Sequence, residues 1–166
     1  MNKMSVLVLL MGVFAVAGMQ DARAQTQIDF GPRIGFDIGG DLEEFFIGAD
    51  GRVGVASLPV LFNGTFDFYF VDNVDIFQFS INALYEFGIS NEAFTPYVGG
   101  GIGISRISTD DDFGIFDRST TDTGLNLIGG ATFGFGNLKP FAQAQITFGD
   151  LDLFTVGGGL LFNLSR

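Results

Sequence analysis

The chain has 166 residues, a formal net charge of −11, and neither cysteine nor histidine. This length suits a single domain, the acidic balance argues against nucleic acid as a partner, and the lack of cysteine excludes a disulfide framework. Without histidine, Ser-His-Asp and Cys-His catalysis and a His/Cys metal site are excluded as well. The composition therefore predicts a non-enzymatic protein with no cofactor.

Residues 1–24 have the pattern of a secretory signal peptide. Lys3 precedes an apolar run over 4–19, and the small-x-small sequence Ala22-Arg23-Ala24 follows it. A retained membrane anchor is the alternative, but 16 apolar residues are fewer than the roughly 20 that a spanning helix needs. We expect cleavage after Ala24, which leaves 25–166 as one mature domain.

After this segment, apolar residues recur at every second position, which is the period of a β-strand. The stretch VLFNGTFDFYF at 60–70 is typical, because four phenylalanines alternate with mostly polar residues and Gly64 fills the one gap. Eight strands are predicted in this way, over 28–38, 47–56, 60–70, 76–87, 94–105, 125–135, 140–148 and 153–165.

Acidic residues gather in every second connection between these strands. The connections 57–59, 88–92 and 136–139 are short, whereas the other four carry 12 of the 18 acidic residues of the mature chain. Short turns at one end and longer polar loops at the other are typical of outer-membrane barrels. The longest connection, 107–124, is predicted to be an extracellular acidic loop that contains Asp110, Asp111, Asp112, Asp117 and Asp122.

One face of the predicted strands is bulky and apolar, and the other is small and polar. Soluble lipocalin-like barrels also alternate, but an eight-stranded barrel is only just wide enough for side chains, so the small face should line the lumen. Water disfavours an exposed apolar face by roughly 25 cal/mol per Å², whereas lipid does not, and a closed barrel satisfies its own backbone in lipid. The sequence predicts an all-β, eight-stranded antiparallel up-and-down transmembrane β-barrel.

Three segments carry a resemblance to a known family: FTPYVGGGIGIS (94–105), TGLNLIGGATFGFGNLKPFAQAQITFGD (123–150) and TVGGGLLFNL (155–164). They resemble the eight-stranded outer-membrane β-barrel family, the OmpA-like and OmpX-like small barrels. The resemblance implies a bacterial outer-membrane location, contact with lipid and lipopolysaccharide, and insertion by the barrel assembly machinery. Because the chain lacks tryptophan, it also implies interfacial girdles made of Phe30, Tyr85, Phe87, Phe94, Phe135 and Phe162.

Charged residues on the predicted inner face form a candidate site. Hairpins centred near 41–44 and 57–58 would bring Arg33 close to Arg52 and Asp50 beside Asp67. Since an unpaired buried charge costs several kcal/mol, these charges should pair into a plug; a gated, cation-preferring pore is the alternative, which the excess of acids favours. The lumen charge cluster comprises Asp29, Arg33, Asp37, Asp50, Arg52, Asp67 and Glu86.

The 107–124 connection is a second candidate site. Its carboxylates are the oxygen ligands that Ca²⁺ prefers, but their spacing is not that of an EF-hand, so we expect only loose divalent cations that bridge to lipopolysaccharide phosphates. Phe113, Ile115 and Phe116 in the same connection suit contact with an extracellular partner. Glycines at 99–101, 129–130 and 157–159 are interpreted as close packing, because no helix follows to make a phosphate loop.

The sequence thus predicts a non-enzymatic outer-membrane protein with a structural or surface-contact role, acidic extracellular loops and a polar, plugged lumen. Two alternatives remain: a narrow cation-preferring, porin-like channel, and an adhesin that acts through 107–124. Conductance would distinguish the first, and removal of the loop would distinguish the second.

Overall fold

The computed structural model describes residues 26–55, 59–71, 74–88, 94–109 and 118–165, so the predicted signal peptide lies outside the described residues. All eight predicted strands are present in the described chain. They are β1 (Thr26–Asp37), β2 (Phe45–Val55), β3 (Val60–Val71), β4 (Val74–Glu86), β5 (Phe94–Thr109), β6 (Arg118–Phe133), β7 (Leu138–Phe148) and β8 (Leu153–Asn163).

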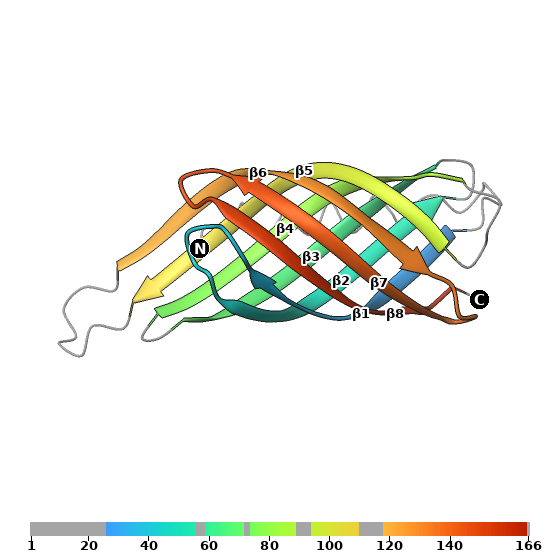
Figure 1. The fold of residues 1–166 in the computed structure, drawn as a ribbon, viewed down its shortest axis with the longest axis horizontal. Helices are drawn as coiled ribbons and strands as arrows, with labels where there is room; N and C mark the ends of the chain where they lie inside the picture. Colours follow the sequence, from blue (N-terminus) through green and yellow to red (C-terminus); the bar gives the residue numbers. More distant parts are fainter. Residues whose placement is uncertain (1–25, 56–58, 72–73, 89–93, 110–117, 166) are drawn as a thin grey trace, which may run out of the picture.

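The strands form one closed barrel in chain order. Each strand pairs antiparallel with the next, and β8 returns to pair with β1, so the sheet has no free edge (Figure 1). We call the end with the connections 38–44, 72–73, 110–117 and 149–152 the loop end, and the opposite end the turn end. The described residues contain no helix long and apolar enough to cross a membrane.

The predicted contrast in connection length is wrong in detail. β3 ends at Val71 and β4 begins at Val74, whereas residues 87–93 separate β4 from β5 at the turn end. β5 and β6 each have 16 residues and pair as far as Thr109 opposite Arg118, so they project at the left of Figure 1. Only 110–117 of the predicted 107–124 loop lies between strands.

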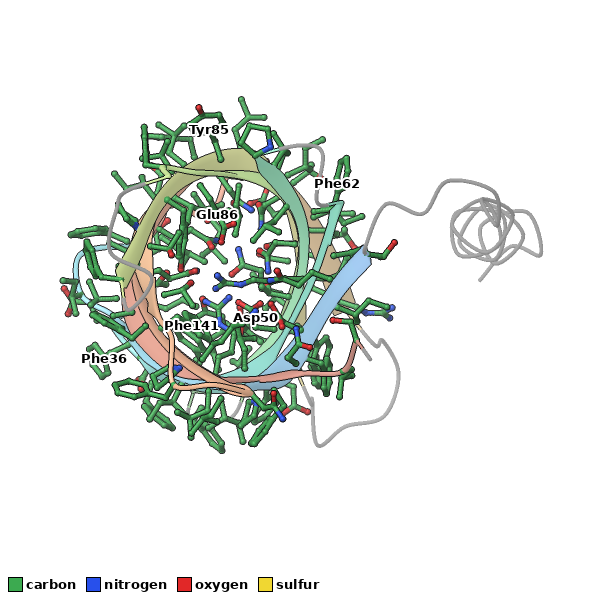
Figure 2. All side chains as sticks on the ribbon, turned by 90° about the vertical axis from the view of Figure 1, so that its right-hand side faces the viewer. Phe36, Asp50, Phe62, Tyr85, Glu86 and Phe141 are labelled. Carbon is green, nitrogen blue, oxygen red and sulfur yellow. The ribbon has the colours of Figure 1, made fainter. Side chains whose placement is uncertain are left out.

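The outer face of the barrel is apolar. Figure 2 looks along the barrel and shows Phe36, Phe62 and Tyr85 pointing outward, and each of these side chains is more than two-fifths exposed. Phenylalanines of neighbouring strands pack ring to ring on this face, as Phe68 and Phe77 do with centroids 5.1 Å apart. The bulky, apolar face therefore points outward, as the limited width of an eight-stranded barrel predicted.

Candidate functional site in the barrel lumen

Side chains from all eight strands fill the lumen, and in the middle of the barrel they are polar. Figure 2 shows Asp50 inside the ring of strands, together with Glu86 and Phe141. The other buried polar side chains of the middle are mainly amides and hydroxyls: Asn63, Thr65, Gln78, Ser80, Asn82, Asn126, Gln143, Gln145 and Thr147.

Two arginines and two aspartates meet in this polar middle. Arg52 lies beside Asp50, with 3.0 Å between its Nε and the carboxylate Oδ1. Arg33 lies between Asp67, at 3.2 Å from Nε to Oδ1, and Asp50, at 4.0 Å from Nη1 to Oδ2. All four side chains are buried. Each charge has a partner of the opposite sign, which offsets much of the cost of removing it from water.

The predicted pairing of these charges was wrong in register. Arg33 lies opposite Gly48, four positions from its expected neighbour Arg52. Asp67 also lies opposite Gly48, two positions from its expected neighbour Asp50. A register error of two or four residues keeps every side chain on its predicted face. Gly48 has no side chain between Arg33 and Asp67, and a Cβ there would overlap the Asp67 carboxylate, so this glycine lets the ion pair form across β2.

Aromatic rings hold both arginines. The Arg33 guanidinium lies 5.2 Å from the ring centroid of Phe46. Arg52 contacts two rings, Tyr97 at 4.8 Å and Phe141 at 4.5 Å, and its Nη2 donates to the Tyr97 hydroxyl at 3.2 Å. A cation over an aromatic face is stabilised most where water is excluded, as it is here. The arginines are therefore fixed by rings as well as by carboxylates.

A chain of side-chain hydrogen bonds, which we call the amide ladder, crosses the lumen from β7 to β2. It ends on the Asp50 carboxylate that also binds Arg52, so ladder and ion pairs form one network in a low-dielectric interior. In order, Gln145 Nε2 donates to Thr147 Oγ1 (3.3 Å), Thr147 Oγ1 to Asn126 Oδ1 (2.9 Å), Asn126 Nδ2 to Asn82 Oδ1 (2.9 Å), Asn82 Nδ2 to Asn63 Oδ1 (3.0 Å) and Asn63 Nδ2 to Asp50 Oδ1 (2.9 Å).

The ladder crosses β5 at Gly101, which lies between Asn82 and Asn126 in the sheet. A Cβ at Gly101 would overlap the Ile81 carbonyl oxygen and the Asn82 Oδ1. Gly101→Ala is therefore expected to lower the free energy of unfolding by about 1–3 kcal/mol through overpacking. The matched control is Gly64→Ala, where a Cβ meets nothing within 4 Å. Urea unfolding in phospholipid vesicles measures both, and equal effects would contradict the close-packing role.

An apolar cluster lies near each end of the lumen, and the sequence analysis missed both. Leu61, Leu84, Tyr97 and Ile128 form a buried cluster near the turn end. A second cluster near the loop end consists of Phe46, Tyr69, Ile76 and Leu153, with Leu42, Val71, Val74, Ile107 and Leu151 packed against it. The prediction of a small and polar inner face is therefore wrong where these two clusters lie. The buried members of both clusters occupy inward-facing strand positions, and strand alternation predicted that they face inward but not that they form apolar clusters.

Asp37 and Asp122 bind backbone at the loop end. Asp37 Oδ2 accepts the N–H groups of Leu42 (3.1 Å) and Glu43 (3.0 Å), and Oδ1 accepts that of Phe154 (2.8 Å). Asp122 similarly accepts from the backbone at Thr123, Asp150 and Leu151. Asp122 is buried within β6, so its predicted place in an exposed loop is wrong. Asp110, Asp111, Asp112 and Asp117 lie outside the described residues.

A polar pocket of about 150 Å³ opens near the turn end, and Asp29, Arg52, Glu86 and Lys139 contribute to its lining. Lys139 Nζ lies 2.9 Å from Asp29 Oδ2, and Asn163 donates to the same carboxylate. Sequence reasoning had not placed Lys139 in the lumen. A cavity of this size is smaller than most ligand sites. The described residues contain no group of three or more side chains arranged to hold a metal ion.

These features define a class of protein. A closed barrel with an apolar exterior and a filled, polar interior is the architecture of a small transmembrane barrel. The sequence matches the family model described as outer membrane protein beta-barrel domain over residues 8–160, and the chain belongs to this family. Its location is therefore the bacterial outer membrane, as the resemblance had implied.

Three solved structures share the fold. The N-terminal β-barrel domain of Pseudomonas aeruginosa OprF is 18% identical, with a TM-score of 0.70, and the match covers 86% of this chain and all of that one. Neisserial surface protein A is 16% identical with a TM-score of 0.61, covering 84% and 96%. Ail, the attachment invasion locus protein of Yersinia pestis, is 20% identical with a TM-score of 0.59, covering 85% and 100%. No curated protein sequence matches the chain.

Proposed function

We propose that this protein is a non-enzymatic barrel with a structural or surface-contact role, and that its lumen is plugged rather than conducting. The observation that carries this is the continuous contact across the lumen, in which the amide ladder and the Arg33 and Arg52 ion pairs share the Asp50 carboxylate. Ions would have to break charge-assisted contacts in the middle and then pass apolar clusters at both ends, where a dehydrated ion is costly.

Planar-bilayer recording of the purified protein tests the plug. We expect no steady conductance from the folded barrel, because no element of the network can move without leaving a buried charge or donor unpaired. Heat-dependent gel mobility verifies that the recorded sample is folded. Steady cation-selective current would contradict the plug and support the narrow channel instead.

Surface contact through the acidic loop end is the second part of the proposal. In the orientation typical of such barrels the loop end is extracellular. β5 and β6 stay paired to Thr109 and Arg118, past the last β6–β7 pair at Leu125 and Phe148. Ail, a structural neighbour, is named as the attachment invasion locus protein. The same proposal includes divalent cations that bridge the carboxylates of the 110–117 connection to lipopolysaccharide phosphates.

Replacing 110–117 by a short Gly-Ser turn tests this contact. The strands end at Thr109 and Arg118, so the exchange leaves the barrel pairs intact, whereas a cut at 109–121 would remove strand residues. We expect cells that display the variant to lose adhesion while the barrel keeps its heat-dependent mobility. Unchanged adhesion would contradict a contact role for the 110–117 connection.

A further inference from the structure

A groove interrupts the lipid-facing surface across β3, β4, β5 and β6. Its volume is about 430 Å³, which is within the range of small-ligand pockets. The residues that line it are almost wholly apolar: Val60, Ala83, Tyr85, Val98, Gly99, Leu127 and Ile128. Gly99 and Ile128 occupy inward-facing strand positions, and the other five occupy outward-facing ones.

The register explains the hollow. Ala83 lies opposite Gly100, and Gly100 lies opposite Leu127, so no large side chain stands between the floor at Ala83 and the wall at Leu127. One row toward the turn end, Tyr85 lies between Val60 and Val98. Directly opposite residues share one face of a sheet. The floor is thus bounded by Leu127 on one side and by the row containing Tyr85 on another.

The position of the groove indicates what fills it. The groove is continuous with the apolar exterior, which lipid hydrocarbon surrounds in an outer-membrane barrel. A hollow left empty there loses dispersion contacts. Tyr85 is one residue from the end of β4, at the level where aromatic girdles meet the membrane interface. A second copy of the barrel fits less well, because a stable interface buries about 800 Å² per partner and this hollow has only seven lining residues.

We propose that this groove is a binding site for one acyl chain of a phospholipid from the leaflet at the turn end. The chain lies over Ala83 and Gly100 and packs against Tyr85, Val98 and Leu127. Packing rather than hydrophobic transfer holds it there, because bulk lipid is equally apolar. The site is independent of whether the lumen conducts.

The chain supplies its own probe. It has three tyrosines and no tryptophan; Tyr69 and Tyr97 are each 1% exposed inside the lumen, whereas Tyr85 is 46% exposed on the groove. Tyrosine emission from the folded barrel in detergent micelles is titrated with phosphatidylethanolamine that carries brominated acyl chains. Bromine quenches on contact, so the quenched fraction reports Tyr85, and Tyr85→Phe gives the background from the lumen.

We expect saturable quenching at about one lipid per barrel, lost in Ala83→Phe, whose ring fills the floor, and kept in Ala142→Phe, an outward alanine of β7 away from the groove. Heat-dependent mobility verifies that each variant is folded. Leu127→Ala, which removes one wall from an exposed position, provides a second test and should weaken the quenching even if Ala83→Phe does not fold. Three results would overturn the proposal: quenching that never saturates, quenching that survives in Ala83→Phe, or quenching that is lost in Ala142→Phe as well as in Ala83→Phe. If Ala83→Phe abolishes a dimer but leaves lipid quenching unchanged, the groove binds a second copy of the barrel and the proposal is wrong.

Discussion

Asp50→Leu is expected to lower the free energy of unfolding by about 3–5 kcal/mol, the cost of breaking a buried ion pair by removing one partner. Asp50 is fully buried and accepts hydrogen bonds from Arg52 Nε, Arg52 Nη2 and Asn63 Nδ2. It also lies 4.0 Å from Arg33. Its removal leaves Arg52 without a carboxylate and cuts the amide ladder at its last step. Urea unfolding in vesicles, followed by gel mobility, measures the loss.

Two comparisons separate charge from packing at this site. Asp150→Ala removes an exposed carboxylate near the loop end and should change stability little. Asp50→Leu combined with Arg52→Met removes both charges of the closest pair, and it should recover a large part of the loss, because apolar replacements of a whole buried pair are often neutral. If the double variant is less stable than Asp50→Leu alone, the burial of an unpaired arginine is not the cause.

The sequence predicted the barrel and the face on which each charge lies, but not which charges meet. Alternation with a period of two assigns a face and is unchanged by a slip of two or four residues. Arg33 could therefore be placed in the lumen, whereas its partner Asp67 could not be identified, because their contact depends on the exact register across Gly48. The amide ladder depends in the same way on the register across six strands, from β2 to β7.

The loop-end boundaries of β5 and β6 escaped prediction for a different reason. Alternation is visible only where one face of a strand meets hydrocarbon. On β6 the outward apolar positions begin at Leu125, whereas Thr121 and Thr123 also point outward and are polar. Strand pairing continues past the apolar band through backbone hydrogen bonds alone. Asp122 was consequently assigned to a loop although it faces the lumen.

Asp37→Ala is expected to release the 38–44 connection and to lower the free energy of unfolding by about 2–3 kcal/mol, because buried donors left without an acceptor cost about 1–3 kcal/mol each and water can reach part of this rim. Asp37 is fully buried and accepts from the backbone of Leu42, Glu43 and Phe154. Glu43 has a φ of 53°, a region that residues other than glycine seldom adopt. Its bond to Asp37 helps to offset that strain.

The release should spread to the apolar cluster that closes the loop end, because Leu42 belongs to the same connection and packs against that cluster. Amide hydrogen exchange of Leu42, Glu43 and Phe154 is expected to accelerate together, since one carboxylate holds all three. The matched control is Asp41→Ala, which removes an exposed carboxylate that accepts from the backbone of Asp152 and should leave those amides protected. Acceleration confined to Phe154 would mean that the 38–44 connection is held by the packing of Leu42 rather than by Asp37, and the closure of the lumen at this end would then rest on apolar contact alone.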